Sequence, residues 1–408
     1  MEDGLSFPEL TLIASILIGL AMFVKSGLRS LGLPPLVGFL VLGFVLRLVD
    51  EQAGLLTEDG EAVFQFLGQV GLIFLLFRVG LESDVRGLLK HLREAVIVAF
   101  FNVAASGLAG FAAAYWLLNL DLIQSLFAGT ALTATSVGLI IPIWQRAKAL
   151  RTRDGEVLLD VAELDDISGV VLMILLFGVA SALREPGASG AGRVLLQEGS
   201  WTLFKLLVFG GLCFLFSQYL EPRVTEFARR TEDPPDPMIT LVAIGMLTGA
   251  VAGVLGFSLA IGAFFGGLVF SRDPQARKID VPFSALYGLF VPWFFIELGF
   301  HVAPQSLMSG LAVGGVLLMA AVMGKVLGGG LPAVPMLGWR SAGLIGVSLV
   351  PRAEICMVVM RHGRARGAWA VPDRVYSGTV VVVALTCMVV PLFLTWLLRR
   401  WGPQRDTE

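Results

Sequence analysis

Long apolar runs separated by short polar stretches recur along the whole chain of 408 residues. Runs of about 20 apolar residues have the length that a helix needs to cross a bilayer, and the period-two alternation of a membrane barrel is absent. Punctuation by Gly, Pro and charged residues predicts about thirteen spans. Their approximate ranges are 8–27, 32–49, 62–81, 95–118, 122–145, 156–182, 201–220, 237–255, 257–271, 283–301, 307–332, 339–360 and 375–398.

Composition agrees with this pattern, because 56% of the residues are hydrophobic, 15% are charged and the mean hydropathy is +0.81. Ordinary soluble domains carry more charge and lack such repeated apolar runs. We therefore expect an all-α polytopic membrane protein surrounded by a lipid bilayer. The net charge of −2 argues against a nucleic-acid partner, because binding to phosphate backbones requires a basic surface.

The basic residues indicate an orientation. If the N-terminus lies outside, most of the 30 Lys and Arg residues fall in connections on the inside, as the positive-inside rule requires. An odd number of spans then places the C-terminus in the cytoplasm. The longest polar connections, at about 183–200 and 221–236, are too short for an appended domain, and no removable signal peptide is expected. Residues 1–408 are therefore predicted to form a single membrane transport domain with no soluble regulatory domain.

Two segments seven spans apart are similar in sequence. Phe74 to Asp84 reads FLLFRVGLESD, and Trp293 to Ala303 reads WFFIELGFHVA. This offset gives the two spans opposite orientations in the membrane, as an inverted repeat requires. Arg78 corresponds to Glu297 in this alignment. We expect these two residues to form a structural charge pair.

The fifth and twelfth spans are interrupted near their centres, by Thr133 to Ser136 and by Val350 to Glu354. Proline removes a backbone donor, and hydroxyl groups satisfy the carbonyls that this frees. A single Thr/Ser run more often bonds back to its own helix, but two broken helices at equivalent positions indicate a binding site where they cross. We expect this site to use the hydroxyl residues Thr133, Thr135 and Ser136.

Asp165 and Asp166 stand side by side within an otherwise apolar span. Asp165 lies nine residues beyond Glu156, which is about 14 Å deep and close to the middle of a hydrocarbon core about 30 Å thick. A carboxylate at this depth is costly and by default marks an ion or proton pathway. Burial raises the pKa of a carboxyl group and a nearby cation lowers it, so a pair in unequal surroundings binds protons and cations competitively. Oxygen ligands suit Na⁺, and no cofactor is expected besides the transported ions.

Further charged residues lie near this pair. Lys325, deep in the eleventh span, is the expected counter-charge; a permanent salt bridge between helices and a proton-exchanging lysine are both open. Glu163 precedes Asp166 by three residues, shares its helix face and is expected to be a third titrating group. Arg352 and Glu354 flank the second break and are expected to stabilise the half-helix ends in a structural network.

Four motifs occur together in one order. They are TATSVG (Thr133 to Gly138), LDDISG (Leu164 to Gly169), GKVLGG (Gly324 to Gly329) and VPRAE (Val350 to Glu354). With them the chain resembles the monovalent cation/proton antiporter-2 family, the bacterial sodium/proton exchangers and their glutathione-gated potassium-efflux relatives. The resemblance covers nearly the whole chain. It implies a thirteen-helix inverted-repeat fold in the bacterial inner membrane, a homodimer, and an elevator movement of core helices (about 95–182 and 307–398) against dimerisation helices (about 8–81 and 201–301).

The resemblance also implies a function and roles for single residues. The chain is expected to be a secondary active antiporter, not an enzyme, that exchanges Na⁺, or alternatively K⁺ or Li⁺, for protons. Asp166 looks like the essential carboxylate, and Asp165 is similar to the partner that pairs with Lys325. Two acids in succession resemble the electrogenic class, since the potassium-efflux members have Gln first. Glu163 and Arg78 depart from the family pattern.

Other functions remain to be weighed. An intramembrane aspartyl protease needs two acids brought from different helices, whereas adjacent residues on one helix diverge. A potassium-efflux pathway or a channel-like or sensor protein on the same scaffold stays open, and proton-coupled flux separates it from an antiporter. Two GxxxG motifs, at Gly262/Gly266 and Gly310/Gly314, fit either dimerisation or close helix packing within one chain.

Overall fold

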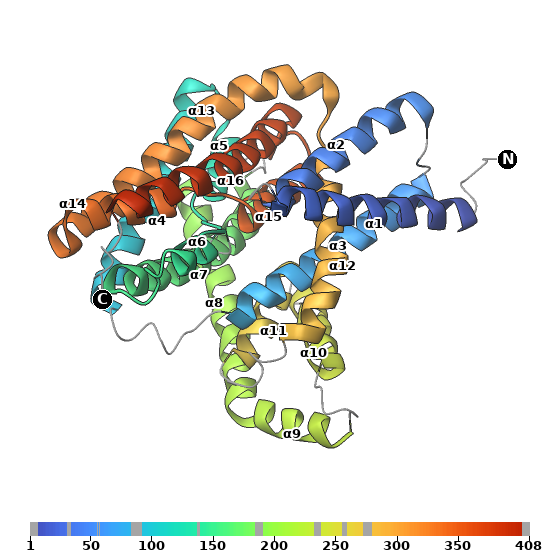
Figure 1. Cartoon of the computed structure of the whole chain (residues 1–408), viewed down its shortest axis with the longest axis horizontal. Helices are drawn as coiled ribbons and strands as arrows, with labels where there is room; N and C mark the ends of the chain where they lie inside the picture. The colour runs from blue at the N-terminus through green and yellow to red at the C-terminus, as the bar shows by residue number, and fades with distance from the viewer. Residues whose placement is uncertain are drawn as a thin grey trace. The chain divides into compact units, whose positions relative to one another are not determined.

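All regular structure in the described part of the chain is helical, as the sequence predicts (Figure 1). The computed structural model describes residues 7–30, 34–54, 56, 58–82, 92–136, 139–183, 191–231, 238–254, 259–271 and 280–401. Within these residues, six helical stretches are long and apolar enough to cross a membrane, and shorter apolar helices accompany them. Each of the predicted spans overlaps helical residues of the described chain.

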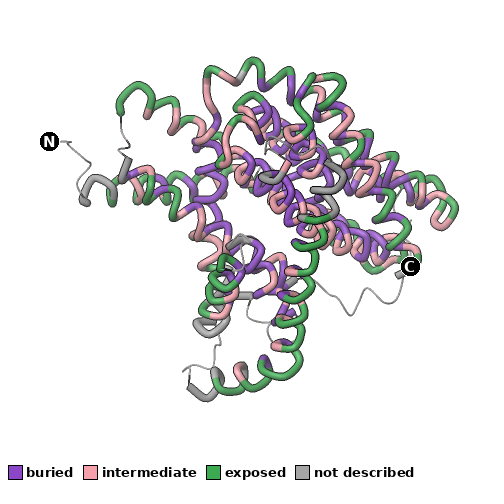
Figure 2. The backbone as a smooth tube through the Cα atoms, turned by 180° about the vertical axis from the view of Figure 1, so that it is seen from behind, coloured by how far each residue is buried: buried purple, intermediate pink, exposed green. Residues whose placement is uncertain are grey.

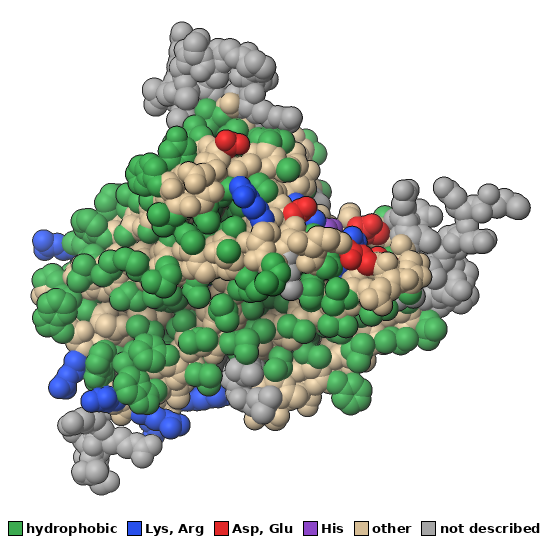
Figure 3. Space-filling model, turned by 90° about the horizontal axis from the view of Figure 1, so that it is seen from above, with side chains coloured by type: hydrophobic (Ala, Val, Ile, Leu, Met, Phe, Trp, Pro, Cys, Tyr) green, Lys and Arg blue, Asp and Glu red, His purple; other side chains and the backbone are tan. Residues whose placement is uncertain are grey.

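The chain divides into two compact units, each built from segments far apart in sequence. The first unit comprises residues 1–27, 38–86 and 189–301, and the second comprises residues 28–37, 87–188 and 302–408. Large hydrophobic side chains are exposed in both, for example Phe23 (71% exposed), Leu108 (68%) and Leu207 (66%). Figure 3 shows a face of the molecule on which hydrophobic side chains predominate. Such exposure is costly in water and suits a protein whose solvent is lipid.

The first unit is organised around α3. Its elements are most of α1 (Phe7–Ser30), α2 (Pro35–Ala53), α3 (Glu58–Glu82), α8 (Ala191–Leu215), the π-helical turn η4 (Phe216–Leu220), α9 (Glu221–Thr231), α10 (Met238–Val254), α11 (Leu259–Phe270) and α12 (Asp280–Phe300). α3 packs against α11 and α12. Gly80 allows this approach, because a Cβ there would collide with the carbonyl of Phe264 on α11. The sequence predicts polar connections before residue 201 and after residue 220, whereas α8 begins at Ala191 and α9 forms a charged helix, largely exposed where its side chains are described (Figure 2).

The second unit carries the predicted broken helices. Its elements are α4 (Leu92–Ala112), the π-helical turn η2 (Ala113–Leu117), α5 (Leu122–Ala131), α6 (Ile141–Arg146), α7 (Arg153–Leu183), a 3₁₀ turn η6 (Pro304–Ser306), α13 (Leu307–Lys325), the π-helical turn η7 (Val326–Gly330), α14 (Leu331–Ser348), α15 (Glu354–Arg366) and α16 (Asp373–Trp401). The helical path is broken between α5 and α6 and again between α14 and α15, as predicted. A kink at Gly338, whose φ is +80°, divides the helical residues of the predicted eleventh and twelfth spans.

Both breaks sit on a buried apolar core of the second unit. Trp144 of α6, Val161 of α7, Ile345 of α14 and Leu394 of α16 belong to this core, and each is at most 1% exposed. The indole N–H of Trp144 also donates to the hydroxyl of Ser348 at 3.0 Å, at the end of α14. These contacts hold α6 against α14. The irregular backbone of the two breaks is therefore buried in protein, which is where non-helical backbone is tolerated inside a membrane.

Both GxxxG motifs pack within the chain. Gly262 and Gly266 lie on α11 against α10, where the Cα of Gly245 would be 3.2 Å from a Cβ on Gly266. Gly310 and Gly314 lie on α13 against α16, where Gly378 occupies the space that a Cβ would need. Packing between neighbouring helices of one chain therefore accounts for both motifs.

Candidate functional site

Asp165 is held by three side chains at the centre of the second unit. It is fully buried on α7, and its Oδ2 atom lies 2.8 Å from Nζ of Lys325 and 2.5 Å from Oγ1 of Thr135. Its other oxygen accepts a hydrogen bond of 2.8 Å from the amide of Asn102 on α4. Both carboxylate oxygens are therefore engaged. A buried ion pair is tolerated when its remaining polar atoms are satisfied in this way.

Lys325 connects this carboxylate to the first broken helix. It is fully buried at the end of α13, and its ammonium group donates to the carbonyl of Thr133, which α5 leaves free where it ends, as well as to Asp165. The glycine-rich turn η7 follows at once and lets α4 approach closely. A Cβ on Gly329 would stand 3.2 Å from Oδ1 of Asn102. The GKVLGG segment thus places the lysine and brings Asn102 to the same carboxylate.

Arg352 also serves the first broken helix, although it lies in the second break. Its guanidinium group is fully buried and donates to the carbonyls of Ala134 and, at 3.4 Å, Thr133. Cations are favoured at the carbonyl end of a helix. The sequence predicts that Arg352 stabilises half-helix ends, and the structure places it at the end of α5. Glu354 occupies the first turn of α15, where a carboxylate complements the helix dipole.

The two breaks contact each other through their backbones. The amide of Ser136 donates to the carbonyl of Pro351 at 2.8 Å, and Oγ1 of Thr135 lies 3.0 Å from the carbonyl of Leu349. The Ser136 hydroxyl is buried and meets no hydrogen-bond partner within the described residues. Thr133 behaves differently from the prediction, because its hydroxyl bonds back to the carbonyl of Thr130 at 2.8 Å and only its own carbonyl enters the site.

Asp166 has surroundings quite unlike those of its neighbour. Its side chain is partly exposed, and no hydrogen bond or ion pair from the described residues reaches its carboxylate. The charged groups that act on it are Asp165, Glu354, Lys325 and Glu163. The structure thus gathers the three acids predicted on α7 with a fourth from α15. A partly exposed aspartate with other acids nearby is a suitable acceptor for a cation or a proton.

Arg78 and Glu297 lie in the first unit, whereas the acid pair lies in the second unit. Glu297 is 1% exposed on α12 and lies against Gly68 of α3, while the Arg78 guanidinium lies 4.5 Å from the ring centre of Tyr287. Ten residues separate Gly68 from Arg78, which is about 15 Å along the helix. The structure therefore places Arg78 and Glu297 at different levels of the α3/α12 pair, instead of in the expected pair.

Asn102 is the site residue that the sequence reading misses. It is fully buried and gives Asp165 its only amide donor among the described residues. Its signal in the sequence is a lone amide within the apolar stretch AFFNVAAS of α4. Placing an uncharged polar side chain inside a membrane span costs less free energy than placing a charge there. Such residues are therefore more common, and Asn102 is a weaker sequence signal than Asp165 or Lys325.

Comparison with known proteins places this geometry in a family. The model of the family described as "Sodium/hydrogen exchanger, transmembrane" matches residues 13–400. The chain belongs to the sodium/hydrogen exchanger family. An exchanger of this family is an integral membrane protein and a monovalent cation/proton antiporter, a transporter and not an enzyme, which agrees with the predicted function.

Individual relatives are distant but match over most of their length. A Na⁺/H⁺ antiporter of Enterococcus hirae is 26% identical over 91% of this chain and 94% of its own. The Na⁺/H⁺-K⁺ antiporter GerN of Bacillus cereus is 25% identical over 90% of each. The sodium proton antiporter MjNhaP1 from Methanocaldococcus jannaschii matches the fold with a TM-score of 0.70 at 15% identity, over 99% of this exchanger and all of that chain.

Proposed function

We propose that the exchanger binds its cation and its proton in turn at the carboxylate of Asp166, beside the ion pair of Asp165 and Lys325. The contrast between the two aspartates carries this proposal. Asp165 is enclosed by Lys325, Asn102 and Thr135, whereas Asp166 is partly exposed and lacks such partners among the described residues. Of these two aspartates, Asp166 is therefore the one that offers carboxylate oxygens to an arriving ion.

The neighbouring groups supply the remaining interactions. The buried Ser136 hydroxyl, which has no hydrogen-bond partner among the described residues, offers a neutral oxygen ligand, which suits a partly dehydrated monovalent cation. Glu163 and Glu354 add negative charge that attracts cations and raises the cost of leaving Asp166 charged and empty. Competition between a proton and a cation for one carboxylate produces exchange without any covalent step.

We expect the transported cation to be Na⁺; K⁺ is the second candidate and Li⁺ is a further one. The relative from Enterococcus hirae is named for Na⁺, and GerN is named for both Na⁺ and K⁺. We further infer that the exchange is electrogenic and that the second unit, which holds the acid pair, carries the ion in an elevator movement. The first unit then serves as the scaffold of a homodimer. The N-terminus lies outside and the C-terminus in the cytoplasm, because this orientation puts most basic residues inside.

The test measures exchange directly. Purified exchanger is reconstituted into vesicles with an imposed proton gradient and an internal pH dye, and Na⁺, K⁺ or Li⁺ is added outside. The fluorescence of the dye should recover on addition of the transported cation, and Asp166→Asn should reduce this recovery to the level of empty vesicles. Asp373→Asn is the matched control, because Asp373 forms an exposed ion pair with Arg364 and should leave transport unchanged. Wild-type rates in the Asp166→Asn vesicles would remove Asp166 from the mechanism, and cation flux without proton movement would favour a channel.

A further inference from the structure

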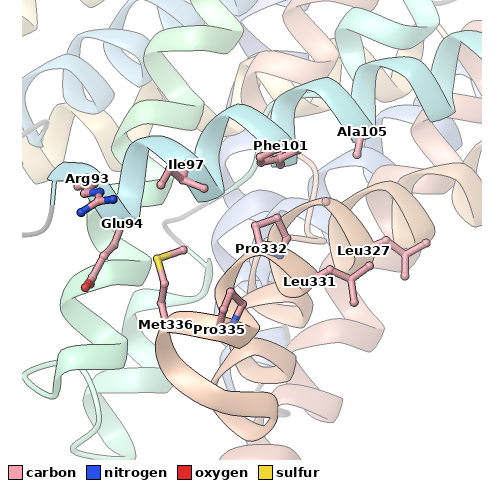
Figure 4. Close-up of a pocket in the computed structure, with 11 residues that line it drawn as sticks. Arg93, Glu94, Ile97, Phe101, Ala105, Leu327, Leu331, Pro332, Pro335 and Met336 are labelled. Carbon is pink, nitrogen blue, oxygen red and sulfur yellow. The ribbon is translucent and has the colours of Figure 1, made fainter.

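An apolar groove runs between α4 and the η7/α14 segment of the second unit (Figure 4). Its volume is about 840 Å³. One wall follows a single face of α4 and the other follows η7 and α14. Its lining residues are Arg93, Glu94, Ile97, Phe101, Ala105, Leu327, Gly328, Leu331, Pro332, Pro335 and Met336.

The groove has the length and openness of a site for an acyl chain. From Arg93 to Ala105 it follows twelve residues of α4, which is about 18 Å. This is slightly more than half of a hydrocarbon core about 30 Å thick, so the groove spans about one leaflet. Phe101 is 51% exposed and Leu331 is 52% exposed, so the walls face outward. The end of the groove farthest from Arg93 is shallow and is lined by the small residues Ala105 and Gly328.

The other end of the groove carries charge. Figure 4 shows Arg93 and Glu94 at the start of α4, across from Met336 and Pro335. Glu94 is already paired, because its carboxylate lies 2.8 Å from the guanidinium of Arg153. Arg93 is exposed and has no ion-pair partner within the described part of the chain. Among the described residues, the mouth therefore presents the uncompensated guanidinium group of Arg93, whose planar donors suit a phosphate.

We propose that this groove binds a phospholipid with an anionic headgroup, with one acyl chain along α4 and the phosphate at Arg93. The apolar walls exclude a hydrated ion, and Arg93, the one unpaired cation among the described lining residues, lies where the helix begins, at the level of the headgroups. The bound lipid would touch α4, the helix whose Asn102 donates to Asp165. Phe101 and Ala105 line the groove, while Asn102, which points about 100° away from Phe101, reaches Asp165.

Native mass spectrometry of the purified full-length exchanger tests this site. The protein in detergent is mixed with equal amounts of palmitoyl-oleoyl phosphatidylglycerol and palmitoyl-oleoyl phosphatidylcholine, and the retained lipid is measured. Wild type should retain the glycerol lipid in several-fold excess, and Arg93→Gln should remove this preference. Leu331→Trp, which fills the groove from a half-exposed position, should lower retention of both lipids.

The matched control is Arg340→Gln, because Arg340 is an exposed arginine of α14 that does not line the groove. This variant should behave as wild type, and melting temperatures should show that all variants are folded. Equal retention of phosphatidylglycerol in the Arg93→Gln and Arg340→Gln variants would overturn the proposal, as would full retention in Leu331→Trp. If Leu331→Trp removes a dimer peak from the spectrum but still retains lipid, the groove would instead be a contact with a second copy of this chain, which would also overturn the proposal. Binding is measured without transport, so failure here leaves the role of Asp166 untouched.

Discussion

Adjacent residues of a helix point about 100° apart, and at the residue scale this divides the two aspartates of α7. Asp165 points toward Lys325 and Asn102, whereas Asp166 remains partly exposed. A buried carboxylate without partners costs several kcal/mol, so the contacts around Asp165 are required for the fold. The same contacts leave Asp166 free to change its ligand.

Removing only one member of the buried pair should destabilise the exchanger. Lys325→Met leaves the Asp165 carboxylate buried without its counter-charge, which costs about 3–5 kcal/mol. Lys325→Met combined with Asp165→Asn removes both charges and should recover most of that loss. Melting temperatures of the two single variants and the double variant, followed by tryptophan fluorescence, measure the coupling. Additive losses in the double variant would show that the two residues do not stabilise each other.

The sequence predicts the charged part of this site better than its neutral part. Asp165, Asp166, Lys325 and Arg352 stand out because a charge at membrane depth is rare and costly. Asn102 does not, because an amide inside a span is common and its partner lies 63 positions away. A hydrogen bond between distant helices depends on packing, which the linear pattern does not contain.

At the scale of elements, the two breaks follow from local chemistry. Pro351 cannot continue the helical hydrogen bonds of α14, and the hydroxyl-rich run at Thr133 to Ser136 supports an irregular backbone after α5. The sequence predicts that the two broken helices cross, and in the structure the two breaks meet through the hydrogen bond between Ser136 and Pro351. The relative level of two packed helices is harder to predict. The similar segments align Arg78 with Glu297 in sequence. In the structure, however, Glu297 of α12 lies beside Gly68 of α3 and not beside Arg78.

Two consecutive glycines of α13 test helix packing in the second unit. A Cβ on Gly314 would lie 2.8 Å from the carbonyl of Gly378 on α16, whereas a Cβ on Gly315 would meet no atom within 4 Å. Gly314→Leu should therefore force the helices apart and cost about 1–3 kcal/mol or more. Gly315→Leu should be neutral or slightly stabilising, because leucine is the better helix former. Melting temperature and yield of folded protein check both; equal effects of the two changes would contradict the α13/α16 contact.

At the scale of the whole molecule, the charge of the loaded site determines whether exchange responds to voltage. If Asp165 and Lys325 stay ion-paired throughout, the site is neutral with either Na⁺ or H⁺ on Asp166, and exchange is one for one. If Lys325 releases its proton while the cation is bound and regains it afterwards, two protons move for each cation. The proposed electrogenic exchange therefore requires that the buried pair takes part in the cycle instead of serving only as a bridge between helices.

Voltage dependence distinguishes these two cycles. Vesicles containing the exchanger are loaded with Na⁺, and valinomycin with a K⁺ gradient sets the interior either negative or at zero potential. When two protons enter for each Na⁺ that leaves, one net positive charge enters, so a negative interior should accelerate internal acidification. Each 100 mV contributes about 2.3 kcal/mol per charge, which is about 50-fold in the final ion gradient. Asp166→Asn vesicles correct for proton leakage and for K⁺ movement through valinomycin. Equal rates and equal final gradients at both potentials would show that the Asp165–Lys325 pair remains intact and that only Asp166 exchanges its ligand.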